Sequence, residues 1–166
     1  MKMIRFPRNL LPLLAVLFLF VGSNVFAAPV PMPHFKLSSV VDGKIIDSNS
    51  FQGQVLLITF FATWCPPCRQ EISALKQLQE ELGPGGFSVV ALSVDEGGPN
   101  IVAQLVKQEK INYPVMLADR ATVKKFGGVV TIPTSFLVNR GGHVVKKYAR
   151  YVSHTLLKRD IEAVLE

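Results

Sequence analysis

The sequence predicts an α/β sandwich built around a mixed central sheet. Two runs of apolar, β-branched and aromatic residues, Val55–Phe61 and Phe87–Val94, are typical of strands that are buried on both faces. Between them, Pro67–Leu82 repeats apolar residues at three- and four-residue steps, as an amphipathic helix does. Near the C-terminus, Asn139–Gly142 is a turn sequence between two apolar segments and predicts an antiparallel hairpin. Strands that alternate with helices and then close with a hairpin imply a mixed sheet.

The N-terminal half adds short elements around the first buried strand. Ala28–Pro33 is a proline-rich lead into the domain, and Asp42-Gly43 predicts a turn between two short strands. The glycines and proline of Gly83–Gly86 end the first long helix. The two short strands are expected at His34–Leu37 and Lys44–Ile46.

The C-terminal half continues the alternation of helices and strands. Asn100 is expected to cap a helix that runs to about Lys110, with Ile101 and Leu105 facing inward and Val102 and Val106 as further inward candidates. Ser153 is expected to cap the last helix. The other elements are expected to be a strand at Tyr113–Leu117, a brief helix at Ala121–Phe126, and hairpin strands at Thr134–Val138 and His143–Tyr148.

Residues 1–27 have the composition of a signal peptide. A basic start is followed by the uncharged apolar run Leu10–Val21 and by small residues before a cleavage point after Ala27. The run is short for a membrane span of about 20 residues, although retention as an N-terminal anchor stays open. Both interpretations place residues 28–166, expected to form one domain, outside the cytoplasm, which in a bacterium is the periplasmic side.

The charge of the chain does not favour nucleic-acid binding. The sequence has 18 basic and 12 acidic residues, and three of the basic ones, Lys2, Arg5 and Arg8, lie in the leader. The remaining 15 basic residues leave the mature domain with a net charge of about +3. We therefore expect no nucleic-acid partner, because such partners select for strongly basic surfaces.

The chain has only two cysteines, Cys65 and Cys68, in one Cys-x-x-Cys motif. A disulfide between them would close a loop too small to contribute much chain-entropy stabilisation, which favours a reactive pair over a structural one. Haem attachment requires a histidine at the position of Arg69, and a zinc site requires further Cys or His ligands. We expect no metal, although a two-coordinate Cu(I) site stays open.

Cys65 follows a predicted buried strand and precedes the first long helix. At a helix N-terminus, the dipole and the free backbone N–H groups favour the thiolate and lower the pKa of a cysteine below its free value of about 8.5. Pro66 and Pro67 suit a first helical turn, where missing N–H donors cost little. The two-residue spacer lets Cys68 reach the sulfur of Cys65.

The segment Phe-Ala-Thr-Trp-Cys-Pro-Pro-Cys, residues 61–68, resembles the motif of the thioredoxin superfamily. From His34 to Glu166, the chain is similar to the exported thiol-disulfide oxidoreductases represented by ResA and TlpA. The resemblance implies a thioredoxin-like three-layer sandwich, with helices on both faces of a mixed central sheet. It also implies an N-terminal β-hairpin and a helix–strand insertion between Asn100 and Leu117.

The resemblance assigns roles to three side chains. Cys65 would be the attacking thiol and Cys68 the resolving thiol of a redox-active disulfide. Glu71 would lie near both thiols and influence their acid-base behaviour. Thr59 supports this role, because it stands where typical thioredoxins carry a buried aspartate. The alternative is a solvated Glu71 that complements the helix dipole.

Three further residues are implied to contact the substrate. Ile132 and Pro133 would be joined by a cis peptide bond that faces the cysteines, and the backbone of Ile132 would bind an extended substrate as an added strand does. Trp64 would shield one side of the site. Arg69 either stabilises a thiolate or faces solvent.

By this resemblance, we expect a reductant of protein disulfides that needs no cofactor, with apocytochrome c as the suggested substrate. Reduction outside the cytoplasm needs electrons from across the membrane, which implies a membrane thiol carrier of the CcdA or DsbD type. We expect a monomer. A Cu(I) carrier and a thiol peroxidase stay open, although peroxiredoxins carry threonine at the position of Ala62.

Overall fold

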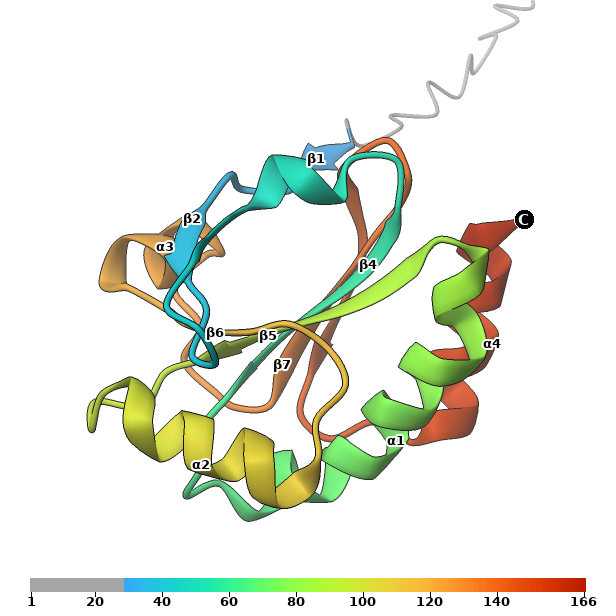
Figure 1. The fold of residues 1–166 in the computed structure, drawn as a ribbon. Helices are drawn as coiled ribbons and strands as arrows, with labels where there is room; N and C mark the ends of the chain where they lie inside the picture. The colour runs from blue at the N-terminus through green and yellow to red at the C-terminus, as the bar shows by residue number, and fades with distance from the viewer. Residues whose placement is uncertain (1–28) are drawn as a thin grey trace, which may run out of the picture.

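A mixed six-stranded sheet forms the centre of the fold. The computed structural model describes residues 29–166, so the expected signal peptide or anchor at residues 1–27 lies outside the described residues. In spatial order, the strands are β1 (Val30–Pro31), β8 (His143–Ala149), β7 (Thr134–Val138), β4 (Val55–Phe61), β5 (Phe87–Ser93) and β6 (Val115–Leu117). The strands β4, β5 and β6 are parallel and the other neighbours are antiparallel, which confirms the mixed sheet (Figure 1).

The remaining elements pack on the two faces of this sheet. The helices are α1 (Pro66–Leu82), α2 (Pro99–Glu109), α3 (Arg120–Lys125) and α4 (His154–Leu165), with 3₁₀ turns η1 (Ser48–Phe51) and η2 (Gly83–Gly85). A separate hairpin consists of β2 (Lys36–Ser38) and β3 (Ile45–Asp47). The N-terminal hairpin and the helix–strand insertion, here α2 and β6, are therefore confirmed. None of the helices within residues 29–166 has the length and apolar character that a membrane crossing requires.

Two apolar cores, one on each face of the sheet, hold the layers together. On one face, α1, α2 and α4 cover buried side chains such as Leu57 and Val89. On the other face, α3 and the β2–β3 hairpin cover Phe60 and Phe136, and the ring of Phe126 lies 5.2 Å from each of these two rings. Every residue of β4 and β5 is buried, as their continuous apolar runs predict. The sandwich with helices on both faces is thus confirmed.

The proline-rich lead and the start of helix α2 differ from the prediction in ways that have a clear physical reason. The proline-rich lead contributes an edge strand, because Val30 of β1 pairs with Val144 of β8. An edge strand tolerates Pro31, since its missing N–H is not needed on the open side. Helix α2 begins at Pro99 with Gly98 as its N-cap, two residues before the expected cap at Asn100. Proline is favoured at a first helical position, where the N–H has no intrahelical partner.

The inward face of α2 agrees with the prediction at Leu105 and at the candidate Val102, and differs from it at Ile101. Val102 and Leu105 are buried, but Ile101 is 46% exposed. Apolar residues at 101, 102 and 105 are compatible with more than one helix rotation, and packing against the sheet selects one. In α4, Ser153 does occupy the N-cap position, but its side chain makes no capping hydrogen bond.

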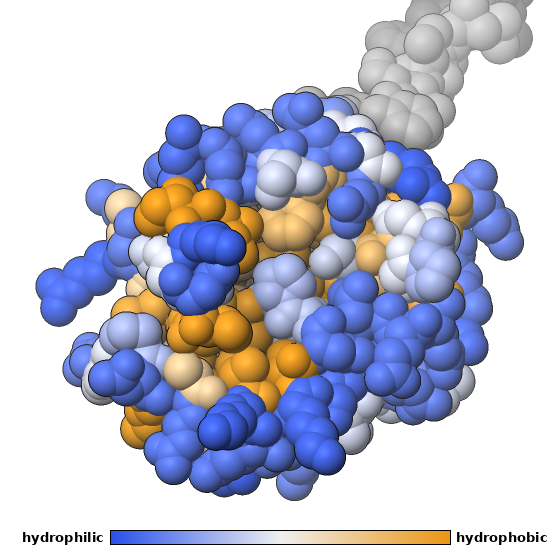
Figure 2. Space-filling view, in the orientation of Figure 1, coloured by the Kyte–Doolittle hydropathy of each residue, from blue (hydrophilic) through white to orange (hydrophobic). Residues whose placement is uncertain are grey.

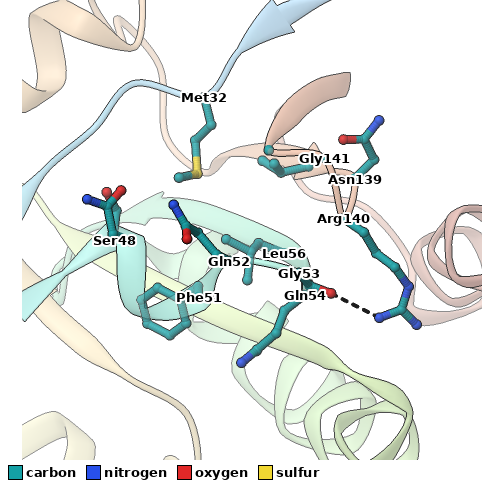
Figure 3. Close-up of a pocket in the computed structure, with 13 residues that line it drawn as sticks. Met32, Ser48, Phe51, Gln52, Gly53, Gln54, Leu56, Asn139, Arg140 and Gly141 are labelled. Atoms are coloured by element: carbon teal, nitrogen blue, oxygen red, sulfur yellow. Dashed lines mark hydrogen bonds between the residues drawn. The ribbon is translucent and has the colours of Figure 1, made fainter.

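A cleft lies at the end of the sheet where β4 begins (Figure 3), opposite the end that leads to Cys65. It is lined by η1, by Met32 and by the β7–β8 turn, which carries Arg140. The guanidinium of Arg140 donates hydrogen bonds to the carbonyl oxygens of Gly53 at 3.1 Å and Gly85 at 2.9 Å. This side chain therefore joins three loops that are distant in the sequence.

Replacing Arg140 with alanine is expected to lower the free energy of unfolding by about 1 kcal/mol, because two hydrogen bonds from a charged donor at the surface are lost. Urea unfolding of both proteins measures this difference. Lys44→Ala is the matched control, since Lys44 forms only an exposed ion pair with Asp42 and should change stability by less than about 0.5 kcal/mol. Equal stabilities of the two variants would contradict the structural role of Arg140.

Candidate active site at the start of helix α1

Strand β4 leads through a short turn into helix α1 (Figure 1), and Cys65 directly precedes the first residue of that helix. Cys65 is the N-cap residue, and its Sγ accepts a hydrogen bond from the backbone N of Cys68 at 3.3 Å. The two cysteines are joined by a disulfide, and their residues are only 4% and 3% exposed. The sulfur of Cys65 therefore lies at the positive end of the helix dipole, where a thiolate is stabilised when the bond is opened.

The loop before β7 places a backbone carbonyl beside this sulfur. The Ile132–Pro133 peptide bond is cis, as predicted. The carbonyl oxygen of Ile132 lies 3.9 Å from Sγ of Cys65, although the residues are 67 positions apart. The next carbonyl, that of Pro133, accepts a hydrogen bond from the backbone N of Arg150 at 2.8 Å, which attaches the loop to the end of β8.

Glu71 is buried rather than solvated, with only 3% of its surface exposed. Burial raises the pKa of its carboxyl to about 7, against an opposing hydrogen bond that Oε1 accepts from the backbone N of Val152. That bond is 2.7 Å long and comes from the segment between β8 and α4. A carboxyl with this pKa exchanges its proton near neutral pH.

A small cavity connects Glu71 with the disulfide. The cavity is also lined by Cys68, Thr59 and Tyr113. Thr59, which stands where typical thioredoxins carry an aspartate, therefore faces the same space as Glu71. The cavity volume is about 10 Å³, close to the minimum for one water molecule. Burial, and then the charge of Glu71, raise the pKa of Tyr113 above its ordinary value.

Trp64 and Arg69 lie on the outer side of the site. Trp64 borders a groove between the active-site turn and α2, and Ile101 lies along the same groove. The guanidinium of Arg69 lies 3.2 Å from the carboxylate of Glu109 on α2. Of the two predictions for Arg69, the structure favours the solvent-facing one, because the side chain is half exposed and paired away from the sulfurs.

Large apolar side chains remain uncovered near the disulfide. Trp64 is 68% exposed and Val130, two residues before Ile132, is 93% exposed. Figure 2 shows apolar residues gathered between α3 and α2, with hydrophilic residues around them. Contiguous apolar surface of this kind is typical of regions that contact other molecules.

Sequence reasoning missed Asp95, which contacts the active-site turn. It is 6% exposed, and its carboxylate accepts hydrogen bonds from both the backbone N and the hydroxyl of Thr63. The available signal is an acidic pair, Asp95 and Glu96, directly after a predicted apolar strand. A polar residue at that point suits a solvated loop equally well, so the sequence does not single out Asp95. Within residues 29–166, no three His, Cys, Asp or Glu side chains are grouped as a metal site.

Comparison with known proteins places this geometry in a family. Residues 27–165 match the family model described as Redoxin. ResA of Bacillus subtilis (strain 168), a thiol-disulfide oxidoreductase, is 30% identical over 127 residues, which are 76% of this chain and 70% of ResA. ResA of Bacillus thuringiensis subsp. konkukian is 31% identical over 115 residues, and there the match spans 69% of this chain but only 65% of the relative.

Solved structures agree with this grouping. A thiol:disulfide interchange protein of the thioredoxin family from Chlorobium tepidum has a TM-score of 0.78 and 36% identity, covering 84% of this chain and 99% of its own. StoA from Bacillus subtilis has a TM-score of 0.64 and 25% identity, covering 79% of this chain and 98% of its own. The chain therefore belongs to the Redoxin family and, within it, to the group of thioredoxin-fold proteins that includes ResA.

Proposed function

We propose that this protein is a thiol-disulfide oxidoreductase that reduces disulfides in other proteins, with Cys65 and Cys68 as its redox-active pair. The observation that carries the proposal is the position of Cys65 Sγ, which caps α1 and accepts the backbone N–H of Cys68 while bonded to the second sulfur. That position stabilises the nucleophilic form of one sulfur and keeps the other within bonding reach.

The reaction begins from the dithiol form. The Cys65 thiolate attacks one sulfur of a substrate disulfide, a new S–S bond forms, and the other substrate sulfur leaves as a thiolate that takes up a proton. The Cys68 thiolate then attacks Cys65 Sγ and displaces the second substrate sulfur. Two electrons have moved to the substrate, and the protein is left with the Cys65–Cys68 disulfide.

Glu71 is the acid-base group of the second step in this proposal. Cys68 must lose its proton before it attacks, and it shares a cavity with Glu71 that has room for a single water. With a pKa of about 7, the carboxylate can accept that proton through the water at neutral pH and return it when the pair is reduced again. Thr59 at the position of the usual aspartate leaves this task to Glu71.

The substrate chain is proposed to lie along the loop of Ile132 and Pro133. A peptide bonded through its cysteine to Cys65 would pass within hydrogen-bonding range of the Ile132 carbonyl, which lies 3.9 Å from Sγ. Backbone contacts of this type accept many sequences. The exposed ring of Trp64 would cover the opposite side of the substrate.

Location and partners follow from the sequence and the resemblance. The basic and apolar leader supports export, with the domain soluble or tethered on the periplasmic side. A membrane thiol carrier of the CcdA or DsbD type would return electrons to Cys65 and Cys68. Apocytochrome c is the proposed substrate class, and the protein would act as a monomer.

The midpoint potential of the Cys65–Cys68 couple tests the direction of the reaction. Trp64 is the only tryptophan and precedes Cys65, so its fluorescence can report the redox state in dithiothreitol buffers. We expect a value near −270 mV, about that of thioredoxin, and a value near −120 mV would indicate an oxidant instead.

A metal-free disulfide reduction assay separates the proposed enzyme from a Cu(I) carrier. We expect turnover of a protein disulfide in the presence of a chelator. Tight anaerobic binding of Cu(I) without measurable disulfide exchange would contradict the proposal and favour the carrier. Rapid consumption of peroxide without reduction of protein disulfides would favour a thiol peroxidase.

A further inference from the structure

The carboxylate of Asp95, just beyond the end of β5, is buried and accepts three hydrogen bonds from two segments. Oδ2 accepts hydrogen bonds from the backbone N of Thr63 at 2.9 Å and from the hydroxyl of Ser93 at 2.7 Å. Oδ1 accepts one from the hydroxyl of Thr63 at 2.6 Å. Thr63 therefore contributes two donors to one carboxylate, although it is 32 residues away in the sequence.

Thr63 is part of the turn that carries Cys65. The backbone N of Cys65 donates to the carbonyl oxygen of Ala62 at 3.2 Å, so Thr63 and Trp64 occupy the two middle positions of a closed turn. The Trp64 side chain is 68% exposed and gives this turn little packing support. The Asp95 carboxylate is thus the main side-chain attachment of the turn to the rest of the domain.

We infer that Asp95 is a positioning residue that holds the turn so that Cys65 Sγ stays on the N-terminus of α1. The inference deepens the proposed function and rests on it for its meaning in the reaction. If the turn were released, Sγ would move relative to the backbone N of Cys68, 3.3 Å away, and the thiolate would lose a donor. Charge-assisted hydrogen bonds of this kind depend steeply on geometry.

The charge of Asp95 and its positioning role have opposite effects on the pKa of Cys65. A nearby negative charge disfavours a second one, so removal of the carboxylate charge alone would lower the pKa of Cys65. Loss of the correct position would raise it. The other charged groups beside the pair are Glu71, which shares a cavity with Cys68, and Arg69, which is paired with Glu109. Neither is bonded to Asp95, so they stay constant when it is replaced.

The test uses the full chain with Cys68→Ser, which leaves Cys65 as the only thiol and keeps the backbone N at position 68. Absorbance at the thiolate band against pH, and the rate of alkylation by iodoacetamide at pH 7, report the pKa of Cys65. We expect Asp95→Ala to raise this pKa by about one pH unit and to slow alkylation about fivefold to tenfold. Glu96→Ala, which removes the adjacent and exposed carboxylate, is the control and should leave both values unchanged.

Asp95→Asn should restore the alkylation rate and the acid dissociation constant of Cys65 to within about twofold of their values in the parent protein. One amide oxygen can keep the Thr63 N–H and the Ser93 hydroxyl, and the amide NH₂ can donate to a rotated Thr63 hydroxyl. Thr63→Val removes only that hydroxyl and should slow alkylation about threefold. This nearly isosteric variant keeps the inference testable if Asp95→Ala does not fold.

An unchanged or lowered pKa of Cys65 in folded Asp95→Ala would overturn the inference. So would an Asp95→Asn variant as impaired as Asp95→Ala, or normal alkylation of Thr63→Val. These measurements involve no substrate. If they come out as expected and the protein still fails to reduce disulfides, the proposed function is wrong and the positioning role stands.

Discussion

Cys68→Ser is expected to accumulate covalent complexes with substrate proteins, whereas Cys65→Ser forms none. The first variant keeps the nucleophile at the start of α1, so the initial attack proceeds, but serine cannot release the mixed disulfide. The second variant lacks the nucleophile altogether. Both should lose turnover by at least ~1,000-fold, because two sulfurs that act as one unit cannot replace each other.

Non-reducing electrophoresis of proteins exposed to a disulfide substrate, followed by mass spectrometry of the adducts, measures the trapping. A reductant should cleave every mixed disulfide that Cys68→Ser forms. The Cys65→Ser, Cys68→Ser double variant is the control for non-specific association. Equal trapping by the two single variants would contradict the assignment of attacking and resolving thiols.

Glu71→Gln is expected to remove a pH dependence of stability that the parent protein shows between about pH 4.5 and pH 7. Below pH 4.5 the carboxyl is protonated in both the folded and the unfolded chain. Between its ordinary pKa of 4.5 and its folded pKa of about 7, Glu71 is ionised only in the unfolded chain, so the free energy of unfolding falls as pH rises. Above pH 7 the decrease in the free energy of unfolding is complete and amounts to about 3 kcal/mol.

The variant lacks this titration and can still accept the N–H of Val152 with its amide oxygen. Its free energy of unfolding should therefore equal that of the parent near pH 4 and exceed it near pH 8. Urea unfolding of the oxidised proteins across this range measures the difference. The same loss of stability with rising pH in both proteins would show that Glu71 titrates normally.

Disulfide exchange should change as well. In the parent protein, we expect resolution by Cys68 to accelerate as pH passes through about 7, where the Glu71 carboxylate becomes available as a base. Glu71→Gln should lose that inflection and slow resolution by about tenfold to 100-fold. Stopped-flow Trp64 fluorescence can follow the step.

Glu80→Gln is the matched control for both Glu71 experiments. It makes the same chemical change on the same helix, but Glu80 is exposed. We expect its stability and its exchange rate to follow the parent protein at every pH. If Glu80→Gln reproduces the effect of Glu71→Gln, the effect comes from net charge rather than from the buried carboxyl.

The strands and helices next to the cysteines could be predicted from the sequence, because their determinants are local. The apolar run Val55–Phe61 appears unchanged as β4, and the periodic segment Pro67–Leu82 starts one residue earlier as α1. Hydrophobic periodicity and proline position depend on neighbouring residues only. The exposure of Ile101 on α2 was mispredicted, because there the local pattern fits two rotations of the helix.

The sequence by itself thus determined the order of the elements and placed Cys65 and Cys68 at the start of a helix behind a buried strand. Only the tertiary structure decided what surrounds the two sulfurs. Glu71 acquires its raised pKa by burial against a segment 81 residues away, and Asp95 reaches Thr63 from the next strand of the sheet. The pKa of a carboxyl depends on solvent and donors in three dimensions, and the local pattern around Glu71 is equally suited to an exposed position on the helix.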